Sequence, residues 1–218
     1  MTLNRKAVKE LKALYSKKRP AIEKRLAEFK SIWKKGTEEE IFAELAFCIL
    51  TPQSKAKLCW QKIDSLAKNR KLFRASAPEL ARSISPVRFH NNKARYIVEA
   101  RKLFSKRGKI AVRERLSALG DPEKMRNWLV ENINGLGMKE ASHFLRNVGL
   151  GDDLAILDRH ILRNLAGLGV IPGIPKTLTV KNYLDIEARM KGFSEKTGIP
   201  MAHLDLLFWS KETGEIFK

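Results

Sequence analysis

The chain has 218 residues, a length that suits one large domain or two small ones. Its 43 lysines and arginines exceed its 24 acidic residues, and the formal net charge is +19. That excess favours a polyanionic partner, either nucleic acid or an anionic membrane surface. No apolar run approaches the roughly 20 residues that cross a bilayer, and the N-terminus lacks the apolar core of a signal peptide. These features exclude an integral membrane protein and favour a soluble one.

Cys48 and Cys59 are the only cysteines of the chain. Two cysteines without partners at metal-ligand spacing indicate small buried side chains in a reducing compartment, not a disulfide framework or a metal site. The scarcity of glutamine, with two residues among many lysines and glutamates, weakly favours a thermophile.

Residues 5–30 form a predicted basic amphipathic helix, in which Pro20 is a candidate break. Its lysines are interpreted as a solvated face, and a face lying on DNA or on a membrane is the alternative. Gly36 ends this region.

Thr37 and Glu40 form a predicted capping box that opens a helix ending at Leu50. That helix is apolar nearly all round, which predicts a position in the centre of a helical domain. Gln53 follows it in an exposed loop. The loop is either an ordinary connection or a rigid support that presents a polar side chain to a ligand.

Further helices are predicted at residues 55–66, 78–84, 94–104 and 105–118. Phe89 lies in the loop before the third of these, and we interpret it as a core residue, with a position facing a cleft as the alternative. No segment between residues 37 and 150 alternates with the period of a strand, so the predicted fold class is all-α.

A tight hairpin between two helices is predicted around Gly135 and Gly137, because two glycines destabilise a helix interior. The upstream helix begins at Asp121-Pro122, and the downstream helix begins near Met138. The first amides of the downstream helix lack internal partners and carry the positive end of its dipole. The hairpin is therefore a candidate phosphate site.

Lys139 lies in the first turn of this downstream helix. The helix dipole disfavours an ammonium there, so Lys139 is a candidate nucleophile, and a plain surface lysine is the alternative. Asp158 lies 19 positions later, at the predicted N-cap of another apolar helix. It is either a capping residue alone or the carboxylate partner of Lys139.

The sequence Gly-Leu-Gly-x-Lys at 135–139, followed by Leu-Asp-Arg-His at 157–160, resembles the helix-hairpin-helix superfamily of base-excision DNA glycosylases. The endonuclease III branch of that superfamily carries a four-cysteine iron–sulfur motif, and the absence of cysteine beyond Cys59 argues against that cluster. The chain is most similar to the type 2 8-oxoguanine DNA glycosylase/AP lyase family, whose members are short, basic and cluster-free and end in a lysine.

The resemblance implies a bifunctional repair enzyme that excises 8-oxoguanine and cleaves the strand 3′ to the abasic site through a lysine Schiff base. It implies that Lys139 is the nucleophile and that Asp158 is the essential carboxylate. The remaining implied site residues contact the damaged base or the DNA: Lys218, Trp209 nine places earlier, and Phe89 for base recognition, Gln53 in the gap left by the extruded base, and Gly135 and Gly137 at the backbone.

The expected partner is double-stranded DNA that contains 8-oxoguanine or abasic sites, and we expect a monomer without a membrane partner, in a prokaryotic cytoplasm. We expect no cofactor and no catalytic metal; relatives bind a monovalent cation between hairpin carbonyls and a phosphate, which the sequence alone does not show. Two alternatives stay open. One is a glycosylase of this superfamily for another lesion, and the other is a non-catalytic DNA-binding module.

We predict two helical lobes with the active site in the cleft between them. Residues 37–150 form the central domain, which contains the hairpin. Residues 1–36 and 151–218 together form the second domain.

Overall fold

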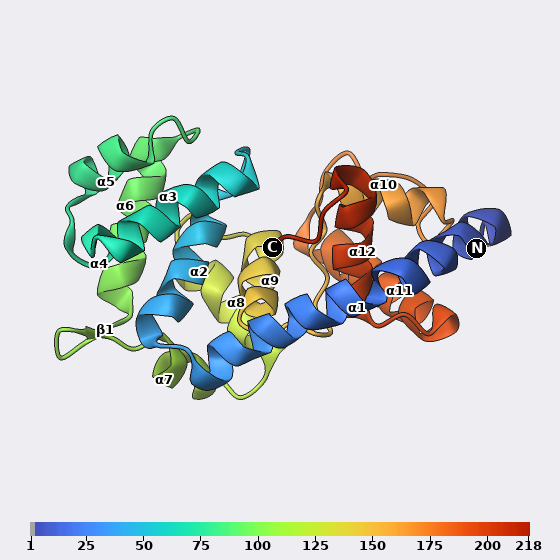
Figure 1. Ribbon diagram of the computed structural model, residues 1–218, viewed down its shortest axis with the longest axis horizontal. Coiled ribbons are helices and arrows are strands. Elements are labelled where there is room, and N and C mark those ends of the chain that lie inside the picture. Colours follow the sequence, from blue (N-terminus) through green and yellow to red (C-terminus); the bar gives the residue numbers. More distant parts are fainter. Residues whose placement is uncertain (1–2) are drawn as a thin grey trace.

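The computed structural model describes residues 3–218, and helices dominate them (Figure 1). The predicted all-α class is confirmed. None of the helices in this part of the chain combines the length and apolar character that crossing a bilayer requires. The helices, in chain order, are α1 (Arg5–Lys35), α2 (Glu38–Leu50), α3 (Ala56–Lys68), α4 (Lys71–Arg74), α5 (Ala77–Ile84), α6 (His90–Leu103), α7 (Val112–Ser117), α8 (Pro122–Asn132), α9 (Met138–Asn147), α10 (Arg159–Gly167), α11 (Val180–Thr197) and α12 (Met201–Thr213).

A short β-hairpin interrupts the helices between α6 and α7. Strands β1 (Ser105–Lys106) and β2 (Lys109–Ile110) pair antiparallel, so the helix predicted at 105–118 is wrong for its first half. The turn residues Arg107 and Gly108 have φ of +50° and +76°. Positive φ at both positions of a two-residue loop matches the twist of paired strands.

The N-terminal helix α1 is continuous, and Pro20 does not divide it. A proline inside a helix costs about 3 kcal/mol, because it removes one backbone hydrogen bond and crowds the preceding turn. Apolar side chains are buried on both sides of the proline, Leu11 before it and Ile22 and Phe29 after it. Their packing holds the two halves of α1 in line.

The buried apolar side chains form two hydrophobic clusters. We call the helices around the first cluster the first lobe and those around the second cluster the second lobe. The first lobe contains α2 to α9, and every residue of α2 from Ile41 to Leu50 is buried in it. The second lobe contains α10, α11, α12 and most of α1. Ile32 of α1 packs against both clusters, and Figure 1 shows α1 running along both lobes. The domain boundaries at 37 and 150 stay a prediction.

A buried ion pair also joins the lobes. Arg126 of α8 is 1 % exposed and contacts Glu187 of α11 through two bonds of 2.6 and 2.9 Å. The same carboxylate accepts a 2.7 Å bond from the amide of Ala155, in the segment before α10. The two bonds from Arg126 and the third from Ala155 satisfy the Glu187 carboxylate. The ion pair therefore holds α8 of the first lobe against α11 of the second lobe.

We expect Arg126→Met to lower the free energy of unfolding by about 3–5 kcal/mol, because the substitution leaves the Glu187 carboxylate buried without its partner. Urea denaturation followed by circular dichroism measures the change. Arg19→Met is the matched control, since Arg19 pairs with Glu23 on the exposed surface of α1. Equal losses in the two variants would show that the buried pair does not stabilise the lobe contact.

Candidate active site

The glycine turn between α8 and α9 has the predicted hairpin form, and its two glycines differ in their requirements. Gly135 has φ of +87°, and a Cβ at this position would lie 2.6 Å from the ring of Tyr96. Only glycine fits there without strain and without displacing the tyrosine. Gly137 has φ of −98° and is the N-cap residue of α9. Four apolar residues of α9 and its C-cap are fully buried in the first lobe: Ala141, Phe144, Leu145 and Val148.

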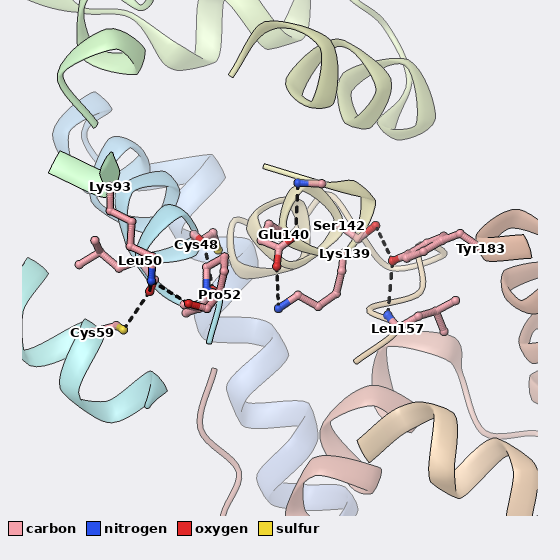
Figure 2. Close-up of polar contacts among 12 residues, drawn as sticks. Cys48, Leu50, Pro52, Cys59, Lys93, Lys139, Glu140, Ser142, Leu157 and Tyr183 are labelled. Carbon is pink, nitrogen blue, oxygen red and sulfur yellow. Dashed lines mark hydrogen bonds and ion pairs between the residues drawn. The ribbon is translucent and has the colours of Figure 1, made fainter. Parts of the chain in front are cut away.

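Lys139 lies in the first turn of α9, about a quarter exposed. Its Nζ lies 2.9 Å from Oε1 of Glu140, and Oε2 of Glu140 accepts a 3.3 Å bond from the amide of Gly137. The Glu140 carboxylate thus provides the anion that the N-terminus of α9 favours, and it holds the lysine side chain in place (Figure 2). Met138 packs against the second lobe, so α9 begins where the two lobes meet.

Asp158 is the N-cap residue of α10, as predicted. Its Oδ1 accepts bonds of 2.7 and 2.8 Å from the amides of His160 and Ile161. Both bonds go to one oxygen, and they fix the direction of the carboxyl group. The neighbouring Leu157 and Ile161 are buried in the second lobe, so the aspartate has a rigid support.

The hydroxyl of Tyr183, on α11, links the lysine helix to the aspartate segment. It donates a 2.5 Å bond to the carbonyl of Ala155 and accepts a 3.3 Å bond from the amide of Leu157. The Oγ of Ser142, in α9, lies 3.5 Å from the same hydroxyl (Figure 2). Burial raises the pKa of Tyr183, so the hydroxyl stays protonated. One buried group therefore contacts both α9 and the residue before Asp158.

The charges of Lys139 and Asp158 act on a common neighbour, Asp205 of α12. Burial raises the pKa of Asp205 to about 6; Arg146 opposes that shift, Asp158 adds to it, and Lys139 opposes it. Nη2 of Arg146 lies 3.1 Å from Oδ2 of Asp205, and both side chains are buried. Lys139, in the first turn of α9, and Asp158, at the N-cap of α10, thus both lie close enough to one carboxyl group to influence its titration.

Lys218 reaches from the second lobe into the first. Its ammonium pairs with the buried carboxylate of Glu44 and lies 3.5 Å from the ring centroid of Trp60. A second oxygen of Glu44 accepts a 2.9 Å bond from Asn147. Burial lowers the pKa of Lys218, and Glu44 opposes that shift. The terminal lysine is therefore an ordered part of a buried polar site.

His143, one turn after Lys139, connects the two lysines electrostatically. Burial lowers its pKa, and the charges of Arg146, Lys139 and Lys218 act in the same direction. The imidazole is therefore neutral at pH 7, packed at 5.6 Å from the ring of Phe47. Arg146, Lys139 and Lys218 thus all lie within electrostatic reach of one neutral buried ring.

The other predicted side chains of the site, those of Trp209, Gln53 and Phe89, are half-buried or exposed. Trp209 is half-buried, and its ring meets His160 edge to face at 5.4 Å. Gln53 is exposed after α2, as expected. Phe89 is 51 % exposed, so its interpretation as a core residue is wrong. Its backbone is left-handed, with φ of +58°, and this turns the ring outward while Val87 fills the core.

Within residues 3–218, no group of three or more His, Cys, Asp or Glu side chains is placed to hold a metal ion. Cys48 and Cys59 are both buried and free.

Comparison with known proteins gives the family. A family model described as 8-oxoguanine DNA glycosylase matches residues 22–199, which is most of the chain. The chain belongs to the 8-oxoguanine DNA glycosylase family. The 8-oxoguanine DNA glycosylase/AP lyase of Fusobacterium nucleatum is 49 % identical over 209 residues, which cover 96 % of each chain.

Solved structures of family members show the same fold. The crystal structure of the 8-oxoguanine DNA glycosylase of Thermotoga maritima superimposes with a TM-score of 0.86 at 37 % identity, covering 97 % of this chain and 98 % of the other. The Methanocaldococcus jannaschii 8-oxoguanine glycosylase/lyase, crystallised with a 15mer DNA containing 8-oxoguanine, gives 0.87 at 36 % identity and covers 97 % and 99 %. The family resemblance inferred from the hairpin and the aspartate is thus confirmed, and so is the fold.

Several residues of this family member's site had no part in the sequence prediction. Glu44 could have been identified from the sequence as a buried charge, because it is the one carboxylate inside the apolar run 41–50. A buried charge of that kind requires a partner, and the partner is 174 positions away. No local feature of the sequence identifies Tyr183 or Asp205, because their contacts depend on how α11 and α12 pack.

Proposed function

We propose that this chain, as a member of the 8-oxoguanine DNA glycosylase family, excises 8-oxoguanine from duplex DNA and then cleaves the strand as an AP lyase. Lys139 is the nucleophile and Asp158 the assisting carboxylate. The observation that supports this most strongly is that both residues lie at helix starts and that both charges reach the Asp205 carboxyl group.

In the first step, the lesion nucleotide leaves the duplex, because a stacked base shields its sugar carbon. The neutral amine of Lys139 attacks C1′, the bond from C1′ to the base breaks, and the base leaves with a proton. The Asp158 carboxylate stabilises the positive charge that develops on the sugar and assists the proton transfer. In the free protein the lysine pairs with Glu140, so attack requires that this pair is broken and that the ammonium loses its proton.

In the second step, the sugar ring opens to give a Schiff base between Lys139 and C1′. Loss of a proton from C2′ then expels the 3′ phosphate, which breaks the strand on the 3′ side of the lesion. Hydrolysis of the Schiff base returns the free lysine. This chemistry requires an amine and a proton acceptor, and the chain supplies both.

The DNA partner is supported by the charge of the chain and by its hairpin. The formal net charge of +19 favours binding to phosphates with a strong dependence on salt. Gly135 brings the backbone of the turn to the surface between α8 and α9, where a phosphate can approach. A monovalent cation at the hairpin carbonyls and a monomeric state stay predictions of the resemblance.

Trapping with borohydride tests this function. The protein is incubated with a duplex that carries 8-oxoguanine, and sodium borohydride is added during the reaction. We expect a covalent protein–DNA complex, a released base and a nick 3′ to the lesion. A panel of duplexes with an oxidised pyrimidine, an adenine mispair or undamaged guanine separates this function from that of a glycosylase for another lesion. Binding without trapping on any duplex would support a non-catalytic module.

The Lys218 site gives a separate prediction about specificity. We expect deletion of Lys218 to reduce the ratio of 8-oxoguanine to guanine excision by about tenfold or more, because a buried donor is lost from the site that reads the base. Cleavage at a preformed abasic site should change much less, since that reaction involves no base. Single-turnover rates on the three substrates measure both effects.

Lys57→Ala is the control for this deletion. It breaks the exposed pair between Lys57 and Glu215, at 2.7 Å, which also ties the C-terminal segment to the first lobe, but it keeps Lys218. We expect unchanged discrimination. Equal losses of base excision and abasic-site cleavage after deletion of Lys218 would mean that the terminal lysine is structural only.

A further inference from the structure

Lys93 of α6 is a buried lysine without a part in the proposed chemistry. It is 4 % exposed, yet its ammonium makes three hydrogen bonds. It donates to the carbonyls of Leu50 and Pro52 at 2.7 Å each (Figure 2). It also donates to Oγ of Ser54 at 3.1 Å. An ammonium has three protons, so every donor is used. All three acceptors belong to the end of α2 and the turn that follows it, which we name the Gln53 turn (residues 51–55).

The other end of Lys93 is fixed to a second turn, the Phe89 turn (residues 85–89). The backbone amide of Lys93 donates a 3.0 Å bond to the carbonyl of Phe89, in the first turn of α6. Lys93 therefore joins two turns that are about 36 positions apart in the chain. One lies after the central helix of the first lobe, and the other lies before α6.

The two turns share an uncommon combination of features. Gln53 and Phe89 both have left-handed backbones, with φ of +55° and +58°, and both side chains are exposed. Neither residue is a glycine, so each conformation carries strain that the surrounding structure must offset. A rigid support that presents an amide and an aromatic ring to solvent suits contact with the stacked bases of a duplex.

The Lys93 anchor also lies beside the hairpin. Burial lowers the pKa of Lys93, and the charges of Arg88 and Lys139 act in the same direction while Glu140 opposes them. Lys93 therefore lies within electrostatic reach of the Lys139 and Glu140 pair. The charge of the candidate nucleophile thus reaches the lysine that anchors these turns, and Figure 2 draws both lysines.

We propose that Lys93 is a positioning residue for base extrusion, which holds the Gln53 turn and the Phe89 turn as one rigid unit that enters the duplex while the lesion nucleotide leaves it. The inference rests on the proposed function. It assigns to Lys93 the geometry of the two inserted side chains and no contact with the reacting atoms, and it places Phe89 in the duplex instead of the base-recognition role that the resemblance implies.

Under this proposal Lys93 affects the extrusion of the base and not the chemical step. Excision rates on duplex and single-stranded DNA distinguish the two steps. An 8-oxoguanine in a single strand needs no extrusion from a base pair, so its excision tests the chemistry alone. We expect Lys93→Met to slow excision from a duplex by about 10- to 100-fold, since loss of the anchor misplaces the inserted side chains. Excision from the single strand and borohydride trapping on it should stay within about twofold of the unsubstituted protein.

Two further variants test whether Lys93 acts through the turns. Lys102→Met is the matched control, because Lys102 is an exposed lysine of the same helix, and we expect it to leave both rates unchanged. In a Gln53→Ala/Phe89→Ala background, Lys93→Met should lower the excision rate on duplex DNA little further, because the two side chains that Lys93 positions are already removed. Ser54→Ala, which removes one acceptor and keeps the ammonium, should show the same duplex-specific loss in weaker form, and it serves if Lys93→Met does not fold.

Equal slowing of Lys93→Met on duplex and single strand would overturn the inference, and so would additive losses in the double-alanine background. If the unsubstituted protein excised no 8-oxoguanine from either substrate, the proposed function itself would fail. Fluorescence of 2-aminopurine placed beside the lesion reports extrusion directly, and its change on binding should be slower in Lys93→Met.

Discussion

Lys139→Gln is expected to abolish borohydride trapping and to slow strand cleavage by more than about a thousandfold, or about 4 kcal/mol of transition-state stabilisation. The amide of glutamine is not nucleophilic, so no covalent intermediate forms. Glutamine can still donate to Glu140, so the first turn of α9 keeps its polar contact. Gel analysis of trapped and nicked products measures both effects.

Lys124→Gln is the matched control for this substitution. Lys124 lies in the first turn of α8, on the other side of the same hairpin, and its Nζ lies 3.0 Å from Asp121. We expect full trapping in this variant, because it removes the same charge from the first turn of the other hairpin helix, at an exposed position away from the glycine turn. If Lys139→Gln retained strand cleavage, the nucleophile would be another residue.

Asp158→Asn is expected to slow base release by about 100-fold or more while leaving DNA affinity and stability largely unchanged. Asparagine caps a helix about as well as aspartate, and its oxygen can accept from the amides of His160 and Ile161. Only the charge that stabilises the sugar cation is lost. Single-turnover base release, filter binding and thermal unfolding separate these quantities.

Asp121→Asn makes the same exchange at the N-cap of α8, where Asp121 accepts a 2.9 Å bond from the amide of Lys124. We expect base release to be unchanged in this control. If Asp158→Asn unfolded the protein, or if it released base at the ordinary rate, then Asp158 would have a capping role only.

Local signals in the sequence sufficed for several helix termini and for the hairpin. The capping box of Thr37 and Glu40, the N-caps Asp121 and Asp158, and the glycine turn are all encoded within a few residues of one another. Each satisfies backbone groups that any helix terminus leaves unpaired, so each is visible without the fold. The pattern from the glycine turn to Asp158 indicated the superfamily, and the lack of further cysteines together with Trp209 and Lys218 indicated the family.

The residues that were missed share a different property, since their partners lie far away in the sequence. Lys93 bonds to atoms about 40 positions earlier, and Tyr183 contacts Ser142 across the lobes. In the sequence, Lys93 is one of two lysines on a helix that also carries two arginines, and nothing local sets it apart. Only the packing of α6 against the end of α2 shows that its ammonium is buried.

The error at Phe89 has a related cause. Composition favours burial of an aromatic residue, but its backbone is left-handed and turns the ring outward. Pro20 does not break α1, although proline locally disfavours a helix interior. Buried contacts on both sides of Pro20 outweigh that local preference. Local propensity determines the conformation of a segment where tertiary packing is weak. Where packing is strong, the packing determines it.

Mass spectrometry of the trapped complex tests the central claim most directly. The unsubstituted protein is reduced with borohydride on 8-oxoguanine duplex, digested, and searched for the peptide that carries the sugar remnant. We predict a single modified side chain, Lys139. A remnant on Lys93, on Lys218 or on any other lysine, with Lys139 unmodified, would contradict the account.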